Sequence, residues 1–238
     1  MPHFAVILPA AGASKRFGPG ASKLFAPLKD GLPVIACTLE RFLSREDVEL
    51  VVIATPAGGF RSTDDHPALR LALEERRVRQ CTGGPSRAQS VRNALAHVPP
   101  HVEWVAVHDA ARPLVSSAVI DRTVEAACRY GAAVPALPIV PTVKQADGPL
   151  PAKVQRTVQR QTLWGVQTPQ VARRAALEAA YEACTLPLDR VTDEAQLLEL
   201  AGQDVWLVAG DERNLKITTP DDLHAARAYL DQAGEDPR

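Results

Sequence analysis

The stretch HFAVILPAAG, at residues 3–12, decides the fold of this chain. An apolar run of this kind is typical of a strand buried on both faces, as in a parallel sheet. The runs ELVVIAT at residues 49–55 and WVAVH at residues 104–108 repeat the pattern. Between the runs lie amphipathic stretches, at residues 33–43, 67–76 and 86–97. Strands that alternate with helices predict an α/β fold with a doubly wound, mostly parallel, Rossmann-like sheet.

The second half of the chain continues the alternation. A helix is expected over residues 117–130, with Ser117 as its N-cap. Asp193 and Gln196 have the spacing of a capping box at the start of a later helix. Further elements are expected at residues 134–140, at 204–209 and from residue 220. We therefore expect one domain over residues 1–238.

Residues 141–161 interrupt this alternation, because they are polar and contain several prolines. Asp147-Gly148, between two extended runs, predicts a β-hairpin. The segment has little apolar surface with which to pack on its own domain. It is either a surface loop or an arm that packs against a second copy of the chain in a homodimer.

Composition excludes several classes of protein. The 238 residues are 46% hydrophobic and 23% charged, with a net charge of -1, so we expect no nucleic-acid partner and no anionic membrane. Residues 1–4 lack the features of a secretion signal, and no apolar run approaches the roughly 20 residues that span a bilayer. The four cysteines lie far apart, which predicts free thiols in a reducing, cytoplasmic compartment.

The first candidate site follows the first strand. Ala10, Ala11 and Gly12 allow a backbone to approach a ligand closely, and consecutive N–H groups can bind phosphates. Arg16 and Lys23 add positive charge at the edge of the sheet where ligands bind in such folds. The loop matches neither the Walker motif nor G-x-G-x-x-G. By itself it could also be a solvated glycine turn.

The second candidate site is HDAARP, at residues 108–113. Asp109, at the end of a central strand, suits a metal ion or a ribose hydroxyl. Arg112 either contributes to binding or pairs with Asp109 and stiffens the turn. His108 is interpreted as structural, because no serine or cysteine nucleophile motif accompanies it.

Further candidates lie elsewhere in the chain. Gly83, before a predicted helix, leaves free backbone groups for a nucleobase edge, and Ser90 adds a hydroxyl. Capping of the helix by Ser86 is the alternative. Polar residues that could complete a site are scattered over the rest of the sequence: Thr142, Lys144, Arg160, Thr168, residues 192–194 and Lys216.

Taken together, these segments resemble the 2-C-methyl-D-erythritol 4-phosphate cytidylyltransferase family over about residues 4–230. The motifs follow in order: PAAG-x-x-x-R, GG-x-x-R-x-x-S, VHDAARP, T-x-K, LW-x-x-QTPQ, TDEA and N-x-K-x-T. The resemblance implies a Rossmann-like homodimer joined by interlocking arms at residues 141–161. It also implies that CTP and methylerythritol phosphate react to give the cytidyl diphospho product and pyrophosphate, with Mg²⁺ as cofactor.

The resemblance also implies roles for individual residues. Arg16 and Lys23 would stabilise charge at the α-phosphorus, while Arg160 and Lys216 would hold the acceptor's phosphate with Thr142 and Thr168. The residues expected to contact cytosine and ribose are Ala10, Ala11, Gly12, Gly83 and Ser90. Asp109 would bind either ribose or Mg²⁺, and Arg112 belongs with the binding residues. Ser22 departs from the family, which commonly has proline before the loop lysine, and we expect it to loosen the loop.

The chemistry is consistent with these residue types. Two anions must meet in phosphoryl transfer, so catalysis needs positioning, a metal and cations and no covalent nucleophile. Two alternatives remain at this point: a related CDP-polyol enzyme that uses, for example, ribitol phosphate, or a nucleotide-binding protein without turnover. A Rossmann dehydrogenase is disfavoured because its glycine fingerprint is missing.

Overall fold

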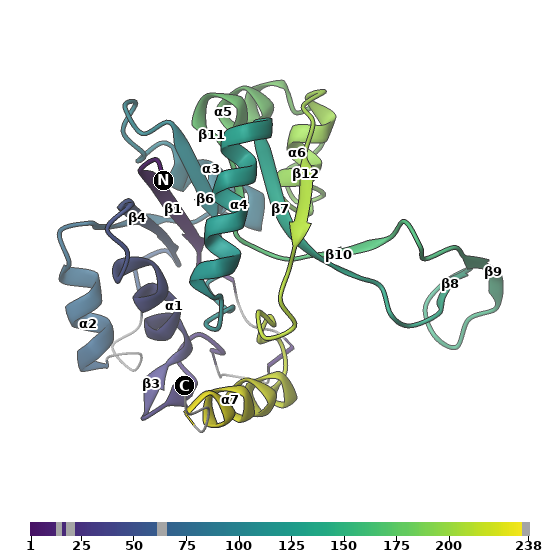
Figure 1. Cartoon of the computed structure of the whole chain (residues 1–238), viewed down its shortest axis with the longest axis horizontal. Helices are drawn as coiled ribbons and strands as arrows, with labels where there is room; N and C mark the ends of the chain where they lie inside the picture. The colour runs from purple at the N-terminus through teal and green to yellow at the C-terminus, as the bar shows by residue number, and fades with distance from the viewer. Residues whose placement is uncertain (13–15, 18–21, 61–65, 235–238) are drawn as a thin grey trace.

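The protein is described by a computed structural model that covers residues 1–12, 16–17, 22–60 and 66–234. Its centre is an eight-stranded sheet in the order β10-β7-β11-β6-β1-β4-β5, with β12 also paired to β7 (Figure 1). The parallel part comprises β1 (Phe4–Pro9), β4 (Val48–Thr55), β5 (Val78–Thr82) and β6 (Trp104–Val107). The predicted α/β, mostly parallel sheet is thus confirmed.

The other half of the sheet is mixed. β7 (Ala132–Pro138) pairs in parallel with β12 (Trp206–Ala209). Two short strands run antiparallel to it, β10 (Trp164–Val166) and β11 (Gln170–Arg173), and β11 also joins β6 to β7. A separate small ribbon is formed by β2 (Pro27–Lys29) and β3 (Leu32–Pro33).

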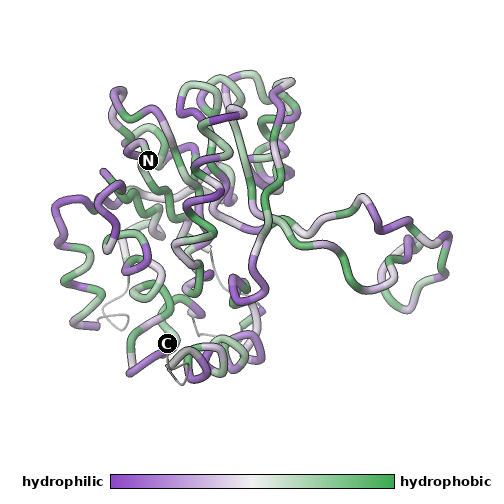
Figure 2. The backbone as a smooth tube through the Cα atoms, in the orientation of Figure 1, coloured by the Kyte–Doolittle hydropathy of each residue, from purple (hydrophilic) through white to green (hydrophobic). Residues whose placement is uncertain are grey.

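Helices cover both faces of the sheet. On one face, alternate residues of β1 such as Val6 share an apolar cluster with residues of α1 (Val34–Leu43) and α4 (Ser117–Tyr130). On the other face, the intervening residues such as Ile7 share a second cluster with residues of α3 (Arg87–Leu95), α5 (Arg174–Ala183) and α6 (Glu194–Leu200). The outer helices are α2 (Pro67–Glu74) and α7 (Pro220–Gly234). Because both faces are covered, the sheet strands are largely apolar (Figure 2).

Two predicted helix starts are corrected in detail. The N-cap of α4 is Ser116, not Ser117: Ser116 has an extended backbone, and its hydroxyl accepts the Val119 N–H at 3.4 Å. At α6, Asp193 caps the helix by accepting the Gln196 N–H at 2.9 Å. The Gln196 side chain accepts the N–H of Thr192, one residue before the cap, so the capping box is only half formed.

Residues 141–161 form an arm that projects from the body (Figure 1). β8 (Val143–Ala146) and β9 (Val154–Val158) are antiparallel, which confirms the hairpin. Its turn is wider than Asp147-Gly148 predicts, because Ala146 pairs with Val154 and residues 147–153 form the loop. Polar and apolar residues follow one another along the arm (Figure 2), and Leu150 is 89% exposed.

The described residues also test the expectations about membrane-spanning segments and cysteines. None of their helices combines the length and apolar content that crossing a bilayer requires. All four cysteines are free, and Cys37 and Cys81 are buried. The predicted free thiols are therefore confirmed in the structure.

Candidate active site

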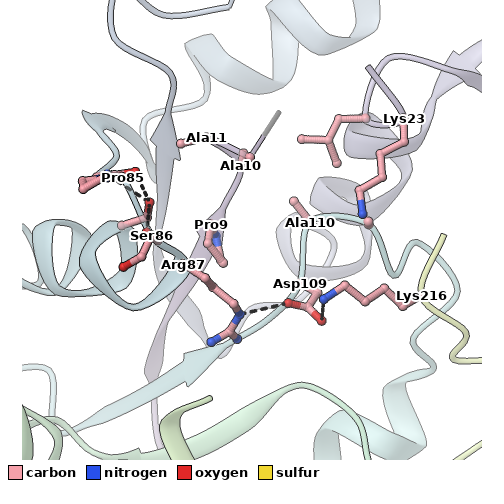
Figure 3. Close-up of a pocket in the computed structure, with 15 residues that line it drawn as sticks. Pro9, Ala10, Ala11, Lys23, Pro85, Ser86, Arg87, Asp109, Ala110 and Lys216 are labelled. Atoms are coloured by element: carbon pink, nitrogen blue, oxygen red, sulfur yellow. Dashed lines mark hydrogen bonds and ion pairs between the residues drawn. The ribbon is translucent and has the colours of Figure 1, made fainter. Parts of the chain in front are cut away.

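A cavity of about 540 Å³ opens at the carboxyl ends of β1, β5 and β6 (Figure 3). Segments that directly follow these strands supply most of its wall, as expected for an open α/β sheet. The described residues that line the cavity are Pro9, Ala10, Ala11, Gly12, Lys23, Leu24, Gly84, Pro85, Ser86, Arg87, Ser90, Asp109, Ala110, Ala111 and Lys216.

One wall is the loop between β5 and α3. A Cβ atom on Gly83 would lie 2.5 Å from the Cβ of Ala11, so only glycine fits between the two loops. Gly83 serves this packing, and its neighbour Gly84 lines the cavity. The Ser90 hydroxyl accepts the Gly84 N–H at 3.0 Å and donates to the Ser86 carbonyl at 2.9 Å. Ser90 therefore both faces the cavity and fixes the loop.

The helix start beside this loop also matches the alternative interpretation. Ser86 caps α3 by accepting the Gln89 N–H at 3.1 Å. Its hydroxyl donates in turn to the Leu188 carbonyl at 3.1 Å. Ser86 thus has a capping role while lining the cavity.

Asp109 is the electrostatic centre of the site. Its Oδ2 lies 3.0 Å from Lys216 Nζ, and its Oδ1 lies 3.3 Å from Arg87 Nε (Figure 3). The Oδ2 atom also lies 3.3 Å from Arg112 Nε. Burial would raise the pKa of Asp109, but these three cations together outweigh burial and hold the pKa far below its usual value. The carboxylate is therefore ionised and organises the cations around it.

Lys23 enters the cavity from the opposite wall and extends towards the Asp109–Lys216 pair (Figure 3). Burial, and then the positive charge of Lys216, lower the pKa of Lys23 to about 8. Arg16 is exposed, and its charge lowers the pKa of Lys23 further. The positive charges of Lys23, Lys216 and Arg16 together favour an anionic ligand. Residues 13–15 and 18–21 of the predicted phosphate loop lie outside the described residues.

A second, smaller cavity of about 170 Å³ adjoins the first. It shares three residues with the larger cavity: Arg87, Asp109 and Lys216. The rest of its described lining consists of Arg112, Val166, Gln167, Thr168, Gln170, Thr192 and Asp193. Arg87, Asp109 and Lys216, which are joined by ion pairs, thus form the boundary between the two cavities.

The turn that carries Asp109 is held from behind by His108. The His108 ring is fully buried, and burial lowers its pKa to about 4, so it is neutral. Its Nε2 lies 3.0 Å from the Arg112 carbonyl oxygen, and its Nδ1 lies 3.0 Å from Thr168 Oγ1. Arg112 also donates to the Asn214 carbonyl at 2.6 Å. Arg112 therefore stiffens the turn, as the alternative interpretation has it, while also facing the second cavity.

The structure brings together nine of the predicted site residues. Those lining one or both cavities are Ala10, Ala11, Gly12, Lys23, Ser90, Asp109, Arg112, Thr168 and Lys216. Four others line neither cavity: Arg16, Gly83, Thr142 and Arg160. Thr142 and Arg160 are exposed and belong to the arm at residues 141–161, which projects from the body of the chain (Figure 1).

Sequence reasoning gave no role to Arg87, which lies between the two cavities. Its Nη1 donates to both oxygens of the buried Glu194, at 2.8 and 2.9 Å, while its Nε faces Asp109. Gln167 and Gln170 were also missed as residues that line the second cavity. All three belong to the motifs GG-x-x-R-x-x-S and QTPQ, so the signal for them was present.

The donor set suits a magnesium ion held mainly by a nucleotide. Asp109 is the one acidic side chain among the described residues that line the larger cavity. Within the described ranges, no group of three or more histidine, cysteine or acidic residues could hold a metal. Mg²⁺ commonly takes one or two carboxylates together with substrate phosphates. A single carboxylate therefore fits such an ion, which Asp109 would hold in place of part of its contacts with the surrounding cations.

Comparison with known proteins decides the family. Residues 4–232 match the family model described as 2-C-methyl-D-erythritol 4-phosphate cytidylyltransferase. The chain belongs to this family. An enzyme of that name from Bacillus pumilus is 38% identical over 230 residues, which cover 96% of this chain and 97% of the relative.

Solved structures of the cytidylyltransferase family match the fold as well. The Francisella tularensis enzyme superposes with a TM-score of 0.80 at 31% identity, over 95% of this chain and 99% of the other. The Thermus thermophilus enzyme superposes with a TM-score of 0.77 at 32% identity, over 96% of this chain and 99% of the other. The resemblance seen in the sequence motifs is thus confirmed over nearly the whole chain.

Proposed function

We propose that this member of the cytidylyltransferase family transfers the cytidylyl group of CTP to 2-C-methyl-D-erythritol 4-phosphate in isoprenoid biosynthesis. The products are 4-diphosphocytidyl-2-C-methyl-D-erythritol and pyrophosphate. The observation that carries the proposal is the pair of adjoining cavities that share Arg87, Asp109 and Lys216. The larger cavity suits the nucleotide and the smaller one the acceptor, while family membership supports the identity of both substrates.

The reaction joins two anions. An oxygen of the acceptor's phosphate attacks the α-phosphorus, and the bond from this phosphorus to the bridging oxygen of the β-phosphate breaks, so that its electron pair leaves with pyrophosphate. Lys23 and Arg16 would stabilise the charge that develops at the α-phosphorus. Lys216, between the cavities, would reduce the repulsion between the two phosphates. No general base is needed, because the attacking phosphate is already ionised at neutral pH.

Mg²⁺ is proposed as the cofactor, with Asp109 as its protein ligand. When bound, the ion neutralises charge on the triphosphate and on the departing pyrophosphate. The choice of Asp109 rests on its carboxylate, which lines both cavities. A ribose hydroxyl is the other proposed partner of the same carboxylate.

We further propose that the chain acts as a homodimer in the cytoplasm. Arg160 and Thr142 would reach the acceptor cavity of a second subunit, because both lie on the exposed arm of their own chain. Exposed apolar side chains on and beside the arm, such as Val140 and Leu150, support its packing against another protein surface. The free cysteines support a reducing compartment.

The other candidate functions have less support. The family match does not favour a ribitol phosphate cytidylyltransferase. A nucleotide-binding protein without turnover has no need for a second cationic cavity beside the first.

A pyrophosphate-release assay with each of the four nucleoside triphosphates tests the proposal. We expect release only when CTP, Mg²⁺ and methylerythritol phosphate are all present. D-ribitol 5-phosphate, in place of the acceptor, should give little release. Equal or faster release with ribitol phosphate, or none with methylerythritol phosphate, would overturn the assignment.

A further inference from the structure

His108 contacts two parts of the site from behind without lining either cavity. Its two ring nitrogens lie 3.0 Å from the carbonyl oxygen of Arg112 and 3.0 Å from the hydroxyl of Thr168. The ring is fully buried and packs edge-on against Phe42, with 5.0 Å between ring centres. Packing and hydrogen bonds together leave the ring one orientation.

These contacts fix which nitrogen carries the proton. A carbonyl oxygen only accepts hydrogen bonds, so Nε2 of His108 must donate to Arg112. The ring is fully buried, and its nitrogens face a carbonyl oxygen and a hydroxyl, neither of which is a carboxylate that could stabilise a positive charge, so the ring is neutral. A neutral ring with its proton on Nε2 has a lone pair on Nδ1. The Thr168 hydroxyl, facing this lone pair, therefore donates its own proton to Nδ1.

The polarity of the Thr168 hydroxyl follows from this arrangement. A hydroxyl group has one proton and two lone pairs. The proton is directed to His108, and one lone pair accepts the Asp109 N–H at 3.0 Å. Thr168 lines the second cavity with one lone pair left and no proton to give.

We propose that His108 is a positioning residue that makes Thr168 an obligatory hydrogen-bond acceptor for the acceptor molecule. Thr168 then receives a hydrogen bond from a hydroxyl group of the polyol. It does not hold the phosphate, because a phosphate oxygen has only lone pairs to offer an acceptor. The phosphate is left to the cations of the same cavity, Arg112 and Lys216. The inference rests on the proposed function, which assigns this cavity to a polyol phosphate.

Two substitutions of His108 separate its two hydrogen bonds. His108→Asn places an amide near the former Nδ1, so its oxygen can still accept from Thr168 while the contact with the Arg112 carbonyl is lost. His108→Gln places an amide near the former Nε2, so it can still donate to that carbonyl while the acceptor for Thr168 is lost. The KM values for CTP and for methylerythritol phosphate are measured for both variants, because KM does not depend on the fraction of folded enzyme.

His108→Gln should raise the KM for the acceptor by roughly five- to tenfold, the size expected for one neutral hydrogen bond. The KM for CTP should stay within about twofold, and His108→Asn should keep the acceptor KM closer to that of the wild type. A merely structural role predicts no such split. The inference is overturned if His108→Gln leaves the acceptor KM unchanged or raises both KM values equally.

Inorganic phosphate, used as a competitive inhibitor against the acceptor, tests the role of Thr168 directly. Thr168→Val should raise the acceptor KM and leave inhibition by phosphate nearly unchanged, whereas Lys216→Ala should weaken that inhibition. If Thr168→Val weakens inhibition as much as it raises the acceptor KM, Thr168 holds the phosphate and the inference is wrong. Turnover by the wild-type enzyme is tested first, so a failure of the proposed function is recognised separately.

Discussion

Replacing Asp109 with asparagine removes the negative charge around which the site is built. The carboxylate contacts three cations within 3.3 Å, and the residue is only 7% exposed. Removing one partner of a buried ion pair costs about 3–5 kcal/mol. The loss should fall near the lower limit, because Arg87 keeps its contacts with Glu194 and the Lys216 side chain is 37% exposed and can turn to water.

We therefore expect Asp109→Asn to lower the free energy of unfolding by about 3 kcal/mol at pH 7. For a domain of this size, such a loss corresponds to a Tm lower by roughly 6–12 °C. Denaturant unfolding followed by circular dichroism measures the difference. The matched control is Asp189→Asn, which changes an exposed aspartate and should alter stability by less than about 0.5 kcal/mol.

The stabilisation that Asp109 provides should depend on pH. The pKa of Asp109 is far lower in the folded protein than its ordinary value of 3.8, so on acidification the unfolded chain takes up this proton first. Its contribution to stability is therefore complete well above pH 4 and is lost as the pH falls further. The difference in the free energy of unfolding between wild type and Asp109→Asn should be constant from pH 7 to about 5 and should shrink below about pH 4. Equal stability of the two proteins at pH 7, or a gap that persists undiminished at pH 3, would refute the reasoning.

Three further predictions concern turnover. Lys23→Ala should lower kcat by a factor of about 10² or more and change the KM for CTP much less; a loss confined to KM would contradict a role at the transition state. Burial and Lys216 lower the pKa of Lys23 to about 8, so its ammonium group loses its proton and charge as the pH rises. The value of kcat/KM for CTP should therefore fall above pH 8. A flat profile up to pH 9.5 would be inconsistent with this. Arg160→Ala should raise the KM for the acceptor. Mixed dimers of Arg160→Ala and Lys23→Ala subunits should regain activity, since one of their two sites then combines an intact body with an intact arm. No recovery would mean that the arm does not complete the partner's site.

Much of the fold could be predicted because burial on both faces leaves a continuous apolar run. Residues 4–8 show this for β1, and residues 49–55 show it for β4. Strands β10 and β11 were missed, because three or four residues give too little periodicity and their places depend on partners far along the chain. The α5 helix was also missed, although Leu177, Ala180 and Tyr181 have the spacing of a buried helical face.

The candidate site could be predicted where its residues directly follow strands. Gly12 and Asp109 are of this kind, since parallel strands place their carboxyl ends at one edge. The network behind these residues could not be predicted, because its members are distant in sequence. Arg87 and Glu194 are separated by 107 positions, and His108 and Thr168 by 60. Pairings of this kind come from the packing of the whole domain.

The turnover of Lys216→Ala is the most direct test of the idea that shared positive charge lets two phosphates react. Pyrophosphate release is measured at saturating CTP and methylerythritol phosphate, with Lys29→Ala as a control at an exposed lysine of β2. Lys216 lines both cavities, so its loss should lower kcat by about 10² or more while the control retains wild-type activity. An unchanged kcat for Lys216→Ala would contradict the account.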